Sequence, residues 1–166
     1  MFDTLFLERA KNVKSLLCIG LDPNVQFIKE QTGLSVYDFN KKVVDHTIDL
    51  ALSFKPQIAH YSALGLEKDL EKTIEYIRSR NDKVPIILDA KRGDIGSTAE
   101  MYAKEAYERY AVDAVTVNPY LGIDSILPYL KYSEKGIIVL AKTSNKKAHP
   151  TYKILFLKVF LTFNIS

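Results

Sequence analysis

Residues 89–94 bring two carboxylates and an ammonium group close together in the sequence. Asp89 and Lys91 stand at the end of an apolar run that begins at residue 84, and Asp94 follows beyond a glycine. Side chains two residues apart on a strand point to the same side of the sheet. A buried pair of opposite charges with only a structural role is often neutral or unfavourable for stability. The stretch is therefore predicted to be either a solvated turn or a polar site for a phosphate, a sugar or a reacting carboxylate.

Two further charged residues lie in or after other apolar runs. Lys55 interrupts the run at residues 52–61 and precedes a proline, which suits a strand that nears its end. Asp22 follows the run at residues 15–21 and also precedes a proline. Considered separately, Lys55 is equally compatible with a surface lysine whose stem covers apolar neighbours, and Asp22 with a residue that forms a turn.

Polar residues follow the last two apolar runs as well. Asn118 stands before a proline, and Ser144 lies in the polar segment at residues 143–145. All five runs therefore end in polar or charged residues at their carboxyl ends. In parallel α/β folds this end of the strands forms the binding face, so the sequence predicts a site there.

The five apolar runs predict the strands of a parallel sheet. They are rich in Val, Ile and Leu and are bounded by Gly, Pro, Asp or Asn, which is typical of buried strands. They occupy residues 15–21, 52–61, 84–90, 113–118 and 136–141. Their alternation with helical patterns predicts an α/β fold. At this point an open doubly wound sheet and a closed barrel are both compatible with the pattern.

Two segments between the runs predict helices in more detail. In the first, an apolar face opposes a charged face that is expected to be solvated. The apolar face comprises Leu66, Leu70, Ile74 and Ile77, and the charged face comprises Lys68, Lys72, Glu75 and Arg78. In the second, Ser97 and Glu100 have the spacing of a capping box, which predicts the start of a helix that runs to about residue 110.

Composition and charge argue against several classes of function. The 166 residues suffice for one domain, and the net charge of +3 comes from 23 basic and 20 acidic residues that are interspersed. This balance does not predict nucleic acid or an anionic membrane as a partner. The N-terminus lacks the pattern of a signal peptide, and no apolar run reaches the roughly 18 residues of a membrane span.

The cysteine and the histidines do not predict a metal site. The single cysteine, Cys18, lies in an apolar run and is expected to be a buried core thiol, and one cysteine without a disulfide partner favours a reducing cytosol. His46, His60 and His149 have no Cys, Asp or Glu partners at metal-ligand spacing, so they are interpreted as non-catalytic.

The spacing of Asp89, Lys91 and Asp94 resembles the Asp-x-Lys-x-x-Asp signature of orotidine 5'-phosphate decarboxylases, the longer second bacterial group in particular. Four other segments agree with that family in order and spacing, and they follow the other predicted strands. They are residues 19–23, 54–57, 117–122 and 141–145. The resemblance covers about residues 10–145. It implies a TIM-type (β/α) barrel that dimerises in the cytoplasm and converts orotidine monophosphate to UMP and carbon dioxide without a metal or an organic cofactor.

The resemblance also implies catalytic roles for four residues. Lys91 is expected to protonate C6 of the pyrimidine, and Asp89 to lie against the departing carboxylate. Lys55, Asp89, Lys91 and Asp94 are expected to form a network of alternating charge. Asp94 and Thr98 are expected to reach across the dimer into the site of the partner.

Four residues are expected to bind substrate within the chain's own site. Asp22 and Lys55 would hold the ribose hydroxyls, and Ser144 would contact the pyrimidine. Asn118 is assigned to substrate binding because it ends the fourth strand.

The sequence departs from the family after residue 145. A barrel of this type usually needs about 250 residues, so only about the first five βα units are present. The segment that should form a loop of small residues for the phosphate reads instead Lys146, Lys147, Ala148 and His149. We interpret the chain as a truncated or frame-altered product, with a partial decarboxylase domain at residues 1–145 and an atypical tail at residues 146–166.

Three interpretations of function remain open at the level of sequence. The first is a decarboxylase that is active when a complete barrel forms. The second is a non-catalytic barrel fragment. The third is another phosphosugar barrel enzyme, such as a hexulose-phosphate synthase, although residues 54–57 and 143–145 favour the decarboxylase.

Overall fold

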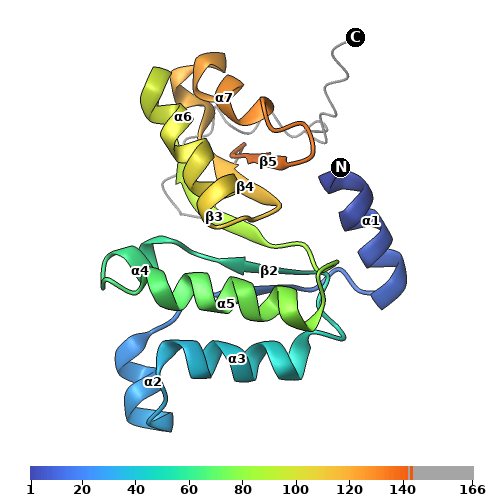
Figure 1. The fold of residues 1–166 in the computed structure, drawn as a ribbon, viewed down its shortest axis with the longest axis vertical. Helices are drawn as coiled ribbons and strands as arrows, with labels where there is room; N and C mark the ends of the chain where they lie inside the picture. The colour runs from blue at the N-terminus through green and yellow to red at the C-terminus, as the bar shows by residue number, and fades with distance from the viewer. Residues whose placement is uncertain (142, 144–166) are drawn as a thin grey trace.

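Five short parallel strands follow one another in sequential order across the molecule (Figure 1). The computed structural model describes residues 1–141 and residue 143. The strands are β1 (Cys18–Leu21), β2 (Ser53–Pro56), β3 (Ile87–Arg92), β4 (Ala114–Val117) and β5 (Gly136–Val139). A doubly wound sheet would reverse its strand order part-way, which this sheet does not do. The sequential strand order therefore favours the (β/α) barrel over the doubly wound sheet, and the chain forms the first five βα units of such a barrel.

The sheet is continuous between β1 and β2 and from β3 to β5, but β2 and β3 are joined by only two isolated bridges. The backbone N–H of Phe54 donates to the carbonyl of Pro85, just before β3, at 3.1 Å. The backbone N–H of Ile58 donates to the carbonyl of Asp89, in β3, at 3.2 Å. Pro56 stands between them, where the next donor would be, and proline has no N–H. The predicted sequential order of parallel strands is therefore confirmed, and the ladder is interrupted at this junction.

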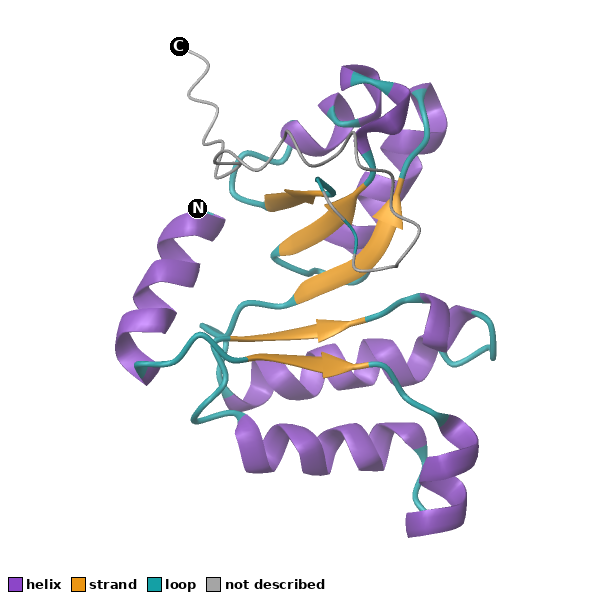
Figure 2. Ribbon diagram, turned by 180° about the vertical axis from the view of Figure 1, so that it is seen from behind, coloured by secondary structure: helices purple, strands orange, loops and turns teal. Residues whose placement is uncertain are grey.

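The helices cover the outer face of this sheet. Figures 1 and 2 show α3 and α5 against β1 and β2, and α6 and α7 beside β3, β4 and β5. The α-helices are α1 (Phe2–Val13), α2 (Val25–Thr32), α3 (Val36–Thr47), α4 (Ala59–Ser62), α5 (Glu67–Arg80), α6 (Gly96–Lys104) and α7 (Leu127–Leu130). The π-helix η1 (Glu105–Arg109) continues α6, and two 3-10 turns, η2 (Pro119–Leu121) and η3 (Ile123–Ser125), follow β4. None of the helices in the described part of the chain is both long and apolar enough to cross a membrane.

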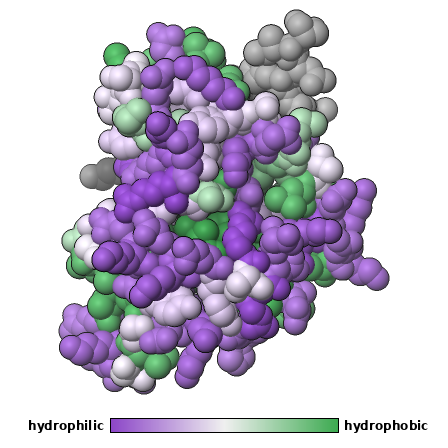
Figure 3. Space-filling view, in the orientation of Figure 1, coloured by the Kyte–Doolittle hydropathy of each residue, from purple (hydrophilic) through white to green (hydrophobic). Residues whose placement is uncertain are grey.

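Alternation along the strands separates the core from the site. Phe54, Leu88 and Val115 are fully buried and belong to the core that the strands form with the helices. The residues next to Phe54 and Leu88, which are Lys55 and Asp89, point to the opposite face. The outer surface is mixed, and Figure 3 shows hydrophilic side chains predominating on one face with small, separate apolar patches.

Helix α5 has the amphipathic pattern that the sequence predicts, with one exception. Leu70, Ile74 and Ile77 are buried, whereas the lysines of the opposite face are exposed. Arg78 was expected to be solvated but is half-buried, because its guanidinium pairs with Asp113 at 2.5 Å and donates to backbone carbonyls near the start of β3.

Helix α1 lies along the amino ends of the strands (Figure 2). The buried guanidinium of Arg9 donates to the carbonyls of Ile48 and Ala51, just before β2. At the other end of the helix, the ring of Phe2 lies where a side chain on Gly136, the first residue of β5, would be. Helix α1 thus connects the beginning of β2 with the beginning of β5.

Two local predictions from the sequence were wrong. Cys18 is exposed instead of buried, because it begins β1, the first strand, and its side chain lies outside the core. Helix α6 begins at Gly96 and has no side-chain cap, so Ser97 and Glu100 do not form a capping box. The carboxylate of Glu100 instead pairs with Lys131 at 2.7 Å.

Candidate active site

The carboxylate of Asp89 lies between two ammonium groups at the carboxyl ends of β2 and β3. Its Oδ1 atom is 2.6 Å from Nζ of Lys91, and its Oδ2 atom is 3.1 Å from Nζ of Lys55. Asp89 is only 8% exposed, whereas the side chain of Lys91 is 45% exposed. The structure therefore confirms that Lys55, Asp89 and Lys91 come together, and it leaves nearly half of the Lys91 side chain exposed.

Hydrogen bonds keep Asp89 ionised in this position. Burial by itself would raise the pKa of the carboxyl group. Hydrogen bonds from Lys91, Thr116 and Lys55 act in the opposite direction and outweigh burial, so the pKa lies below its ordinary value. At neutral pH Asp89 is a carboxylate, and the three side chains form an alternating array of positive, negative and positive charge.

An irregularity in β3 sets the direction of Lys91. The register between β3 and β4 shifts between Leu88 and Arg92, so the chain accommodates extra residues there. Within this bulge the φ angle of Lys91 is +47°, a left-handed conformation that non-glycine residues rarely adopt. Strained backbone of this kind persists only where its surroundings enforce it, and it is common at functional sites.

Thr116 belongs to the site although the sequence reasoning did not select it. Its hydroxyl donates to Oδ1 of Asp89 at 2.9 Å and accepts hydrogen bonds from the backbone N–H groups of Ala90 and Lys91. The only signal in the sequence was a hydroxyl between two valines of a predicted strand. Threonine is common in strands, so that signal is weak.

Asp94 and Thr98 do not join the Lys55, Asp89 and Lys91 group within the chain. Oδ1 of Asp94 accepts a hydrogen bond from the N–H of Ile95 at 2.8 Å, and Asp94 forms no ion pair among the described residues. Thr98 is exposed in the first turn of α6.

Two other predicted residues follow strand ends. Asp22 is exposed immediately after β1. Asn118 follows β4 and uses its side-chain oxygen to accept from the N–H of Tyr120 at 3.0 Å, which caps η2. Gly93 packs closely beside it, and a Cβ at that position would lie 3.2 Å from Cβ of Asn118, which is a tight contact. Ser144 lies outside the described residues.

The histidines in the described part of the chain bind backbone carbonyls. Nδ1 of His46 is 2.7 Å from the carbonyl of Lys42, and Nδ1 of His60 is 3.3 Å from that of Pro23. Over residues 1–141 and 143, no three His, Cys, Asp or Glu side chains are grouped so that they could hold a metal ion.

The family model of the orotidine 5'-phosphate decarboxylase / HUMPS family matches residues 15–156 of the chain. The chain belongs to this family. A relative from Cellvibrio japonicus, named orotidine 5'-phosphate decarboxylase, is 53% identical over 152 residues, which are 86% of this chain and 56% of the relative. A relative of the same name from Ralstonia pickettii is 54% identical over 134 residues, which are 79% of this chain and 49% of the relative.

Solved structures of decarboxylases show the same arrangement of strands and helices. The OMP decarboxylase of Leishmania donovani matches with a TM-score of 0.77 and 38% identity, over 87% of this chain and 55% of that one. An orotidine 5'-phosphate decarboxylase described as putative, from Streptomyces avermitilis, matches with a TM-score of 0.76 and 33% identity. The fold is therefore a partial TIM barrel, and the chain spans about half the length of the family members it matches.

Proposed function

We propose that the chain carries the charged catalytic centre of an orotidine 5'-phosphate decarboxylase and forms UMP from orotidine 5'-phosphate when its barrel is complete. The observation that carries the proposal is the placement of Asp89 between Lys55 and Lys91, at 3.1 and 2.6 Å. The reaction needs no metal or organic cofactor in this scheme and takes place in the cytoplasm, in the synthesis of pyrimidine nucleotides.

The chemistry follows from the charges at the site. When the bond between C6 and the carboxyl group breaks, carbon dioxide leaves and the electron pair stays on C6. The ring offers no position over which this charge can spread, so a fixed cation close to C6 has to stabilise it. Lys91 supplies that field and transfers a proton from Nζ to C6. Asp89 lies against the carboxylate that departs and holds the ammonium group of Lys91 in place.

Binding of the rest of the substrate is assigned to the surrounding strand ends. Asp22 and Lys55 hold the ribose hydroxyls, and Ser144 contacts the pyrimidine. Asn118 lies at the same carboxyl edge of the sheet, and its side chain shapes the loop after β4. The positions of Asp22, Lys55 and Asn118 at the carboxyl ends of β1, β2 and β4 support this assignment.

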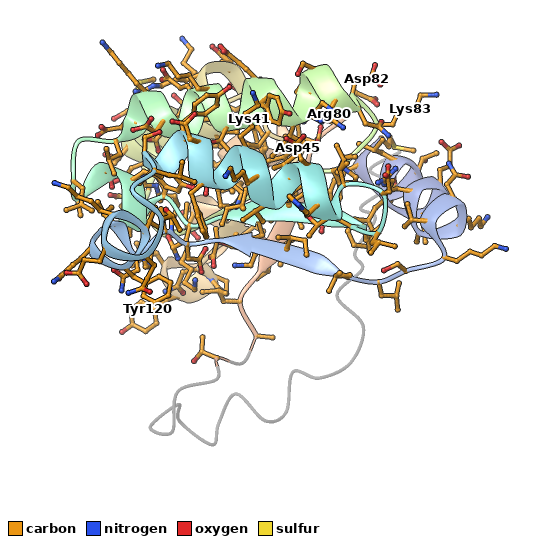
Figure 4. All side chains as sticks on the ribbon, turned by 90° about the horizontal axis from the view of Figure 1, so that it is seen from below. Lys41, Asp45, Arg80, Asp82, Lys83 and Tyr120 are labelled. Carbon is orange, nitrogen blue, oxygen red and sulfur yellow. The ribbon has the colours of Figure 1, made fainter. Side chains whose placement is uncertain are left out.

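We infer that two chains associate through the surface around α6 and the turns after β4. Asp94 and Thr98 are close to this surface, and neither contributes to the charged group of its own chain. Large apolar side chains are exposed there: Ile95, Met101, Tyr120, Leu121, Ile123 and Leu127. Figure 4 shows Tyr120 projecting from the body of the chain, on the side away from α5. Exposed apolar residues that gather in one region are typical of an interface between proteins.

Association of two chains through this surface can be tested by the mass of the protein in solution. Analytical ultracentrifugation of the wild-type chain should give the mass of two chains. The double variant Tyr120→Asp, Ile123→Asp should sediment as one chain, because it buries charge in the interface. The matched control is Leu50→Asp, which changes an equally exposed apolar residue outside this region and should remain dimeric. A dimer that persists in the double variant would refute this interface.

A hexulose-phosphate synthase remains the alternative within the same family. The names of the Cellvibrio japonicus and Ralstonia pickettii relatives favour the decarboxylase. A barrel in which residues 1–141 are joined to the C-terminal part of the Cellvibrio japonicus relative tests the choice. It should form UMP from orotidine 5'-phosphate and leave a hexulose phosphate unchanged. A folded barrel that consumes the hexulose phosphate and not orotidine 5'-phosphate would overturn the proposal.

A further inference from the structure

The bulge in β3 removes two backbone donors from the ladder with β4. The register passes directly from Leu88 to Arg92 as partners of β4, so the N–H groups of Ala90 and Lys91 have no carbonyl opposite them. The hydroxyl oxygen of Thr116 accepts from both, at 2.9 Å each. One side chain of β4 therefore satisfies the donors that the bulge leaves without a ladder partner.

The same hydroxyl also fixes the carboxylate of the site. It donates to Oδ1 of Asp89 at 2.9 Å, and this oxygen is the one that Lys91 contacts at 2.6 Å. A hydroxyl has one proton to donate and two lone pairs with which to accept, so the hydrogen-bonding capacity of Thr116 is fully used. Thr116 is 7% exposed, which leaves solvent little access to replace these bonds.

Packing within the strand does not require this hydroxyl. Thr116 faces away from the core, on the opposite side of β4 from its neighbours Val115 and Val117. Valine carries a methyl group where threonine carries its hydroxyl, and it avoids the free-energy cost of burying that hydroxyl. The polar atom of Thr116 is therefore better explained by what it binds, namely the backbone of Lys91 and the side chain of Asp89.

We propose that Thr116 is a positioning residue that sets the ammonium group of Lys91 relative to the carboxylate of Asp89. It holds the left-handed backbone of Lys91 through the N–H groups and holds Asp89 through the hydroxyl proton. It does not touch the reacting atoms. Its effect on turnover rests on the proposed function, whereas its effect on Asp89 does not.

The experiment follows the titration of Asp89 in the 166-residue chain by carbon-detected NMR of the labelled carboxyl groups, with Asp89→Asn used to assign the resonance. Thr116→Val removes a donor to Oδ1, so the pKa of Asp89 should rise. Thr116→Ser keeps the hydroxyl and should leave that pKa unchanged. Thr73→Val is the matched control, because Thr73 is also a buried threonine with hydrogen bonds, but it lies on α5.

A folded Thr116→Val chain in which Asp89 titrates as in the wild type would overturn the proposal. The proposal would also be overturned if Thr73→Val raised the pKa of Asp89 as much as Thr116→Val does. The shift would then come from a general loss of stability and not from the hydroxyl of Thr116. If Thr116→Val does not fold, hydrogen exchange of the wild type decides. Slow exchange of the Ala90 and Lys91 amides supports the proposal, and fast exchange overturns it.

Turnover gives a second readout in the completed barrel described above. Misplacement of a reacting group by about 1 Å can cost on the order of 10²-fold, so Thr116→Val should lower kcat by about that factor and leave KM little changed. Thr116→Ser should restore kcat. If the wild-type barrel does not decarboxylate orotidine 5'-phosphate, the proposed function fails, while the titration of Asp89 still decides the role of Thr116.

Discussion

At the scale of single residues, the stability of the site depends on Asp89 remaining charged. Two ammonium groups and a hydroxyl converge on its carboxylate. If one charged side chain of such a buried group is removed, the remaining charge has no partner. The resulting loss of stability is larger than the stability that the intact ion pair contributes. Lys55 and Lys91 are partly exposed, so solvent reduces that cost for them more than it does for Asp89.

The depressed pKa of Asp89 predicts how stability depends on pH. A carboxyl group whose pKa is lower in the folded state stabilises the fold at pH values above its unfolded pKa of about 4. This contribution is lost as the pH falls through the lower, folded pKa. Asp89→Asn should therefore reduce the free energy of unfolding at pH 7 by about 1–3 kcal/mol. In the variant, the free energy of unfolding should also fall less steeply as the pH decreases below about 4.

Urea unfolding of the wild type and of Asp89→Asn at a series of pH values measures this contribution. Asp82→Asn serves as the control, because Asp82 is exposed, lies far from the proposed interface in sequence, and its carboxylate forms no ion pair within the described chain. Equal slopes against pH for the wild type and Asp89→Asn, below pH 5, would contradict the account.

Sequence reasoning found the charged residues of the site but not the hydroxyl between them. Asp89, Lys91 and Lys55 interrupt or end apolar runs, and a charge in such a place is conspicuous. Thr116 sits inside a strand of β-branched residues, where threonine needs no special explanation. Its role arises from the bulge in β3, and a bulge depends on the pairing of two strands that are distant in sequence.

At the scale of elements, helix α1 closes the amino ends of the strands by two specific contacts. Arg9 binds the carbonyls before β2, and the ring of Phe2 occupies the space beside Gly136 in β5. A Cβ on Gly136 would lie 2.3 Å from the ring, which is far inside van der Waals contact. Glycine is therefore required at that position by the approach of α1.

Gly136→Ala should destabilise the fold for this reason. Overpacking of this kind typically costs about 1–3 kcal/mol, and the free energy of unfolding in urea measures it. Phe2→Ala in the same chain should recover part of the loss, because it removes the clash. Gly20→Ala is the matched control, since the nearest atom to its Cβ is 3.9 Å away. Equal effects of the two glycine substitutions would contradict the contact between α1 and β5.

The sequence predicted which elements form and in what order, but less well where they join. The apolar runs and the helical pattern of α5 were confirmed by the structure. The broken ladder at Pro56 and the uncapped start of α6 depend on which neighbour each backbone group faces. That information belongs to the assembled sheet, and no local pattern contains it.

At the scale of the whole molecule, the chain contains the charged centre but spans about half of its relatives. The 166-residue chain alone should therefore decarboxylate orotidine 5'-phosphate very slowly at best. Binding energy from the phosphate orients the substrate and stabilises the transition state, and the chain has no arginine after Arg109 to provide it. The exposure of Lys91 also weakens its field, because water screens charges more than a closed site does.

Loss of orotate absorbance with the purified chain tests this expectation, and the barrel completed with the Cellvibrio japonicus segment is the positive control. A rate for the chain alone that equals the rate of the completed barrel would show that the remaining βα units matter less than proposed.

The central claim is that Lys91, held by Asp89, performs the decarboxylation, and kcat of the completed barrel carrying Lys91→Ala tests it most directly. Loss of both a positioned acid and a stabilising charge should lower kcat by about 10³-fold or more. Lys68→Ala, on the exposed face of α5, should leave kcat unchanged. The fold of both variants is checked by circular dichroism. A folded Lys91→Ala barrel that decarboxylates orotidine 5'-phosphate at nearly the wild-type rate would contradict the role assigned to Lys91.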